Sequence, residues 1–130
     1  MPSPNSAPRF IADVKSWAAE ISAANANRDG TGTVVTVATA EAQGSRIDLV
    51  RVVAEVTTTA GMVRLFLHDG STFFLVKELA VTALTASATV PAFETEWVPT
   101  EPLLLPSGWT LRAATENAET FNVIAVGGDY

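Results

Sequence analysis

The side chains that could do chemistry are few and scattered. The chain has a single histidine, His68, and no cysteine. A serine nucleophile needs an activating base, usually histidine, but no serine here lies in a nucleophile-elbow context. His68 directly precedes Asp69-Gly70, a strong hairpin-turn dipeptide. We therefore interpret His68 as an exposed residue at the end of a turn, and we predict that the chain is not an enzyme.

One pair of carboxylates has a spacing that deserves comparison with glycosidases. Glu94 and Glu96 are two residues apart, which places them on the same face of a strand. The acid and base of a glycosidase, however, usually come from different strands that line a cleft. Acidic residues that alternate with aromatic ones, here Phe93 and Trp97, are typical of a solvated strand face. We expect no catalytic pair.

The sequence also offers little for a metal or a cofactor. Without cysteine, zinc sites built on thiolates are excluded, and one histidine cannot build a histidine-based site by itself. Asn27, Asp29 and Gly30 lack the acidic spacing and the closing glutamate of an EF-hand. The glycines form no phosphate-binding fingerprint. We predict no cofactor and no metal.

Composition limits the class of protein further. The chain has 130 residues, of which 48% are hydrophobic and 17% are charged, enough for one domain with a hydrophobic core. No apolar run approaches the roughly 20 residues of a membrane helix. The net charge is −6 and the eight basic residues are scattered, which argues against a nucleic acid or membrane partner. The N-terminus lacks the features of a signal peptide, so synthesis in the cytoplasm is expected.

The N-terminal part of the chain is expected to differ from the rest. Residues 1–8 contain three prolines and predict an extended arm. Apolar residues then recur at spacings of four, three and four, which predicts an amphipathic helix over residues 10–24. These residues are Phe10, Val14, Trp17 and Ile21. An alternative is a strand over 17–22, because Trp17, Ala19 and Ile21 also alternate.

From residue 33 onward the pattern is that of β-strands. Val- and Thr-rich segments alternate with Gly, Pro and Asp turns, which predicts about eight strands in an antiparallel β-sandwich or jelly roll. Asp69-Gly70 predicts a hairpin, and a slip in the alternation near Leu49-Val50 predicts a β-bulge. The expected organisation is an arm, helix and loop over 1–32 and a β-sandwich over 33–130.

Tryptophans are the usual handles for sugars and peptides. Trp17, Trp97 and Trp109 are far apart in the sequence, and each lies among apolar positions, so burial in the core or in a subunit interface is the simpler interpretation. The alternative is a carbohydrate- or receptor-binding module of a tail fibre or another tail accessory protein. It requires at least two exposed, coplanar aromatic residues, and Trp97 and Trp109 are the candidates.

Several segments together resemble a known class of proteins. The segments are 44–48, 57–70, 105–115 and 119–125, and the third opens with a Leu-Pro-x-Gly turn that leads into the penultimate strand. With them, residues 30–130 resemble small β-sandwich structural proteins of tailed bacteriophages. The resemblance implies a head decoration (cement) protein or a related capsid or tail accessory protein. Such proteins are usually trimeric and are assembled onto the particle, so the expected location is the virion.

The pattern of apolar residues also favours association. Residues 46–56 are apolar on both sides of the expected strand for several positions, more than one sandwich easily covers, and closed homo-oligomers bury such a second face. We expect a homotrimer that also binds the major capsid protein or another virion protein. The expected docking residues are Phe10, Val14, Trp17 and Ile21.

Overall fold

The computed structural model describes residues 10–130, and the arm expected over residues 1–8 lies outside that range. Within the described residues the chain forms nine β-strands and no helix. The strands are β1 (Asp13–Ile21), β2 (Val35–Thr39), β3 (Ser45–Ala54), β4 (Gly61–His68), β5 (Phe73–Val81), β6 (Glu94–Trp97), β7 (Leu103–Leu105), β8 (Thr110–Thr115) and β9 (Phe121–Asp129). No helix long and apolar enough to span a membrane is found among these residues.

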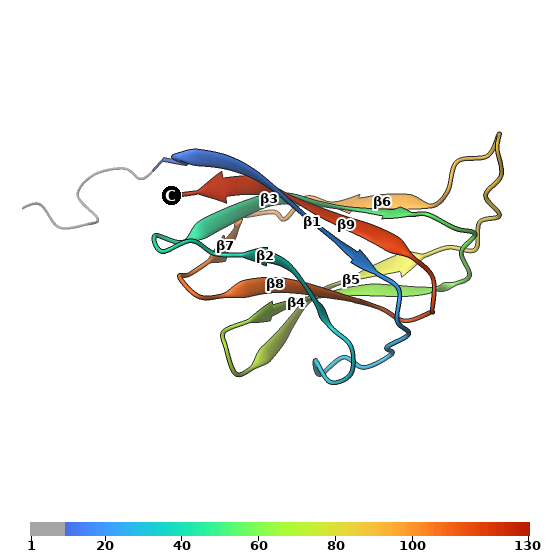
Figure 1. Cartoon of the computed structure of the whole chain (residues 1–130), viewed down its shortest axis with the longest axis horizontal. Helices are drawn as coiled ribbons and strands as arrows, with labels where there is room; N and C mark the ends of the chain where they lie inside the picture. Colours follow the sequence, from blue (N-terminus) through green and yellow to red (C-terminus); the bar gives the residue numbers. More distant parts are fainter. Residues whose placement is uncertain (1–9) are drawn as a thin grey trace, which may run out of the picture.

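The strands form two antiparallel sheets that pack face to face (Figure 1). The first sheet has the order β1-β9-β3-β6, and β7 pairs with β3 beside β6. The second sheet has the order β2-β8-β4-β5. The prediction of an all-β antiparallel sandwich is therefore confirmed, with nine strands in place of about eight and without the N-terminal helix.

The strands are paired as in one long hairpin that is rolled into two sheets. β4 and β5 form the tip of this hairpin, and the strands then pair outward: β3 with β6 and β7, β2 with β8, and β1 with β9. Rolling also places β9 beside β3 and β8 beside β4. At the tip, the Asp69 carboxylate accepts hydrogen bonds from the backbone N–H groups of Ser71 and Thr72. The predicted hairpin at Asp69-Gly70 is confirmed.

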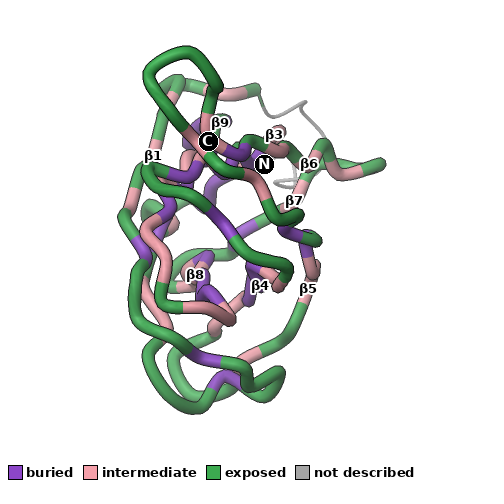
Figure 2. The backbone as a smooth tube through the Cα atoms, turned by 90° about the vertical axis from the view of Figure 1, so that its right-hand side faces the viewer, coloured by how far each residue is buried: buried purple, intermediate pink, exposed green. Residues whose placement is uncertain are grey.

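The core lies between the sheets and is built by alternate residues of the strands. Ile47, Val50 and Val52 of β3 and Val123 and Ala125 of β9 are completely buried. β-branched side chains dominate because they pack well on a pleated surface. Figure 2 shows buried segments along the strands and exposed residues over much of the loops. The predicted bulge in β3 is present, where the register with β9 shifts between Ile47 and Leu49.

The predicted helix over residues 10–24 is wrong. Residues 13–21 form β1, which pairs with all nine residues of β9. Along β1, Trp17, Ala19 and Ile21 point toward the core, and Ser16 and Glu20 point away from it. Helix propensity is a weak preference that tertiary pairing overrides, and here β9 supplies a complete ladder of hydrogen-bonding partners. β1 is thus part of the sandwich, and the strand alternative was nearer to the structure.

Candidate interaction surface

The outward side of the β1-β9-β3 sheet is a broad surface that the described chain leaves largely uncovered. Directly opposite residues on antiparallel strands point to the same side of a sheet, so the register defines this surface in rows. We call it the open face. Its residues are Val14, Ser16, Ala18 and Glu20 on β1, Asn122, Ile124, Val126 and Gly128 on β9, and Arg46, Leu49, Arg51 and Val53 on β3.

Three rows of the open face on β1 and β9 are uncharged and mostly apolar. Ser16 lies opposite Val126, which in turn lies opposite Leu49, and Ala18 lies opposite Ile124. Val126 is 40% exposed and Val14 is 88% exposed. An outward β-strand face that meets only water normally carries polar residues. In three successive rows, this half of the open face carries Ser16 as its only polar side chain.

The charged residues at the other side of the open face pair with each other. The Arg51 guanidinium lies 3.4 Å from the Glu96 carboxylate and 3.9 Å from that of Glu94. Arg46 Nε lies 2.9 Å from Asp48 Oδ1, and Arg46 Nη2 donates a 3.4 Å hydrogen bond to Asp48 Oδ2. Each exposed pair adds at most about 1 kcal/mol to stability. Because of these ion pairs, the positive charges of Arg46 and Arg51 are already balanced within the chain.

At one end of the open face, Glu20 lies close to Glu55, which follows β3. Their side chains share a hydrogen bond, and this contact, with smaller contributions from burial and from the Glu20 charge, raises the pKa of Glu55 above its ordinary value. Two carboxylates in contact favour keeping one proton between them. The acidic pair therefore lies at the end of the uncharged rows on β1 and β9.

The opposite side of the molecule has its own cover. Residues 22–34 connect β1 to β2 and cross the outward side of the second sheet, where Phe66 is completely buried. Gly30 packs on Phe73, since a Cβ atom at Gly30 would lie 2.2 Å from Phe73 Cγ. The Asn25 side chain donates hydrogen bonds to the backbone carbonyls of Thr31 and Thr33, which fixes the loop. Phe66 on the outward side of this sheet is thus buried within the chain, whereas Leu75, which lies opposite it, is 38% exposed.

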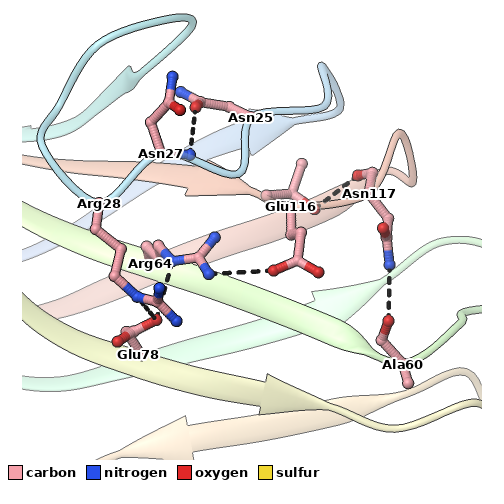
Figure 3. A network of polar contacts seen from close by, with 9 residues as sticks. Asn25, Asn27, Arg28, Ala60, Arg64, Glu78, Glu116 and Asn117 are labelled. Atoms are coloured by element: carbon pink, nitrogen blue, oxygen red, sulfur yellow. Dashed lines mark hydrogen bonds and ion pairs between the residues drawn. The ribbon is translucent and has the colours of Figure 1, made fainter.

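A charged network holds this cover in place (Figure 3). The side chain of Arg64 is 3% exposed, and its guanidinium contacts Glu78 Oε2 at 2.9 Å and Glu116 Oε1 at 3.1 Å. Arg28, from the covering loop, binds the same Glu78 oxygen at 2.9 Å. The hydrogen bond from Arg28 is the largest influence on the pKa of Glu78 and lowers it. Burial acts in the opposite direction, but the bond from Arg64 adds to the lowering, so the pKa lies below its ordinary value. A buried cation needs such partners, so we assign the network a structural role.

An open groove lies where β1, the β2–β3 turn and the end of β9 meet. Its lining residues are Asp13, Lys15, Glu41, Ala42, Gln43, Asp129 and Tyr130. Lys15 Nζ lies 3.4 Å from Asp129 Oδ2, and the Ser45 hydroxyl donates a 2.6 Å hydrogen bond to Asp129 Oδ1. Lys15 also lies 3.9 Å from Glu41 Oε1, so these contacts join three segments of the chain.

The predicted docking residues do not form a single stripe. Phe10 is 78% exposed and lies beside Ile11, which packs over Gly128 at the end of the open face. Val14 is on the open face, but Trp17 and Ile21 point into the core, because successive side chains of a strand alternate between faces. Sequence reasoning missed the surface formed by β9. The signal that could have revealed it is the apolar run in β9, which has apolar residues on both sides of the strand, as residues 46–56 do.

The two tryptophans of the binding-module alternative are not brought together. Trp97 is on β6 in the first sheet and Trp109 directly precedes β8 in the second, and both are half-buried against the core. The ring of Trp109 stacks instead on Phe74, with centroids 6.1 Å apart and planes 12° apart. The exposed, coplanar pair that this alternative requires is therefore not formed by these residues.

His68, Glu94 and Glu96, which were considered as candidate catalytic residues, contact an aromatic ring or an arginine. The His68 ring lies 4.2 Å from the ring of Phe73. Glu94 and Glu96 face Arg51, as described above. Within residues 10–130, no group of three or more His, Asp or Glu side chains is placed to hold a metal ion.

Comparison with known proteins gave matches among solved structures only. No family model matches the chain, and no curated protein matches it. Six solved chains match, and among them are two crystal structures of a pentameric capsid protein isolated from metagenomic phage sequences. Each is 14% identical to this chain and covers 94% of it, with TM-scores of 0.43 and 0.44. The chain spans 71% of one of these proteins and 63% of the other. Their pentameric assembly differs from the trimer implied by the sequence resemblance.

Proposed function

We propose that this chain is a structural protein of a tailed-phage virion, and specifically a head decoration (cement) protein that binds and stabilises the head lattice. Its activity is adhesion and not catalysis. The observation behind the proposal is the open face, which carries apolar and internally paired residues where a solitary sandwich would carry solvated ones. A protein built to be covered by neighbours has this kind of surface.

The strand order supports the same proposal. β6 and β7 both pair with β3, so they occupy one position in the first sheet. With that position counted once, each sheet has four positions, and the strands pair from the ends of the chain inward. A nested order of this kind is expected of a jelly roll, an architecture common in viral capsid domains, and it supports the proposal. The resemblance of residues 30–130 to phage structural proteins points to the same class.

The test uses the phage that encodes the chain. Heads are purified on density gradients from the wild-type phage and from a phage with this gene deleted, and the chain is quantified in each fraction by mass spectrometry. We expect the chain in the head fraction at a copy number proportional to the lattice subunits. We also expect deleted heads to release their DNA at a lower temperature, and purified protein to restore the wild-type value.

Three results would contradict the proposal. The chain could be absent from purified particles, it could sediment with tails separated from heads, or deleted heads could resist heating as well as wild-type heads do. Recovery with tails would refute the decoration role but retain a virion structural role.

A further inference from the structure

We propose that the open face is the surface on which a second copy of this chain packs. The proposal deepens the virion role above, because it names the partner that covers this face. The surfaces compared are the two outward sides of the sandwich. Residues 22–34 of the same chain pack on the outward side of the second sheet at Phe73, although Leu75 there is 38% exposed. On the first sheet, Val14 is 88% and Val126 40% exposed.

The lack of free charge on the open face indicates a partner whose contacting surface is uncharged. Three rows across β1 and β9 have no charged residue, and the flanking Arg46 and Arg51 are already paired within the face. A basic or acidic partner would find no complementary charge in these rows. The chain as a whole carries a net charge of −6, so two copies repel each other at long range and attract only through apolar contact. Added salt should therefore leave their association unchanged or strengthen it.

The size of the open face suits one further copy. β1 and β9 have nine residues and β3 has ten. At about 3.3 Å per residue and about 4.8 Å between strands, the face measures roughly 30 Å by 15 Å. This flat footprint of roughly 450 Å² grows when side-chain relief and the rim, including Leu104, are added. Stable interfaces bury about 800 Å² on each partner, so a partner the size of this chain can cover the face.

The residues on the open face resemble those on the inner side of the same strands. Ile124 and Val126 alternate with the core residues Val123 and Ala125 on β9. The small exposed residues Ser16 and Ala18 leave room between the larger ones for side chains of a facing surface. The chain already packs surfaces of this composition against each other in its own core, and it therefore offers the matching partner.

The experiment compares two glutamate substitutions at equally exposed valines. V126E places a carboxylate on the open face, and V90E places one in the loop before β6, where the valine is 41% exposed. Masses are measured by light scattering and by sedimentation equilibrium from 1 to 100 μM. We expect wild-type protein and V90E to form the same oligomer. In V126E the dissociation constant should rise at least roughly 100-fold, because the interface would bury an unpaired charge.

A second variant keeps the test independent of folding. If V126E loses its circular dichroism signal, V14E replaces it, since Val14 is 88% exposed and its substitution removes little packing, and V98E at a 62% exposed valine is its control. The salt series, from 0.05 to 1 M NaCl, is run on the wild-type protein. Association that weakens steadily with salt would overturn the proposal.

Other outcomes separate this proposal from the virion role. A wild-type protein that stays monomeric at 100 μM, or a folded V126E that associates as V90E does, would overturn the self-contact. If the chain is nevertheless found in purified heads, another virion protein covers the open face, and the virion role stands. If the chain is absent from virions but V126E alone dissociates the oligomer, the self-contact stands without that role.

Discussion

The cover over the second sheet gives the most direct test of the structural reasoning. Gly30 and Gly108 have nearly the same positive φ, +87° and +84°. A Cβ atom at Gly30 would lie 2.2 to 2.6 Å from three carbons of Phe73, whereas a Cβ atom at Gly108 would meet nothing within 4 Å. Substituting each glycine by alanine therefore imposes the same backbone strain but very different steric costs.

The expected magnitudes follow from these two terms. A left-handed conformation costs an alanine about 1–2 kcal/mol, and this should be the whole effect of G108A. G30A adds the cost of forcing an extra methyl group against a packed ring, about 1–3 kcal/mol. We therefore expect G30A to lower the free energy of unfolding by about 2–5 kcal/mol, and the excess over G108A reports how firmly the loop packs on Phe73.

The assay is urea denaturation of the two variants, together with the double variant G30A/F73A. Removing the ring takes away the contacts with Cγ and Cδ2 but leaves Phe73 Cβ at 2.4 Å, so the steric term should become smaller and the effects of the two substitutions at this contact should be non-additive. Hydrogen exchange of residues 22–34 should become faster in G30A and stay unchanged in G108A. If G30A is no less stable than G108A, residues 22–34 do not pack on Phe73, and the contrast between a covered and an open face fails.

Three further predictions concern polar contacts. S45A removes the hydroxyl that donates to the buried carboxylate of Asp129, and it should lower the free energy of unfolding by about 1–3 kcal/mol, measured by urea denaturation. The backbone N–H groups of Thr72 and, to a smaller extent, Ser71 hold the pKa of Asp69 below its ordinary value of 3.8. The stability that Asp69 adds is therefore complete above that pH and is lost as the pH falls through the lowered pKa, so the stabilities of wild-type protein and D69A should converge in acid. Contact with Glu20 raises the pKa of Glu55 above 4.5, so the pair destabilises the fold once both groups are ionised. E20Q should raise the melting temperature at pH 7 and give no gain below pH 4.5; an equal gain at both pH values would contradict the carboxylate contact.

Local signals in the sequence identified most of the β-structure. The Asp69-Gly70 turn fixes the hairpin of β4 and β5, because the turn residues and the flanking alternation act over a few residues only. The slip near Leu49 indicated the bulge in β3 for the same reason. The helix prediction failed at residues 10–24, where spacings of four and three coincide with an alternating pattern. There the choice between helix and strand depends on whether a partner strand is available.

The interaction surface was only partly predictable. The excess of apolar residues over 46–56 indicated a second apolar face, and Val14 was among the residues expected to dock. Trp17 and Ile21 were assigned to the same surface only because a helix was assumed. The contribution of Ile124 and Val126 could not be inferred, since it requires knowing that β9 lies between β1 and β3.

The sequence by itself determined the class of fold, the position of the central hairpin and the scarcity of reactive side chains, because composition, alternation and turn chemistry are properties of neighbouring residues. The tertiary structure alone decided that residues 13–21 form a strand, that residues 22–34 cover one sheet and that the other sheet stays open. Each of these depends on contacts between residues far apart in the chain, such as the pairing of β1 with β9 and the packing of Gly30 on Phe73. Such contacts form only when the strands have rolled into two sheets.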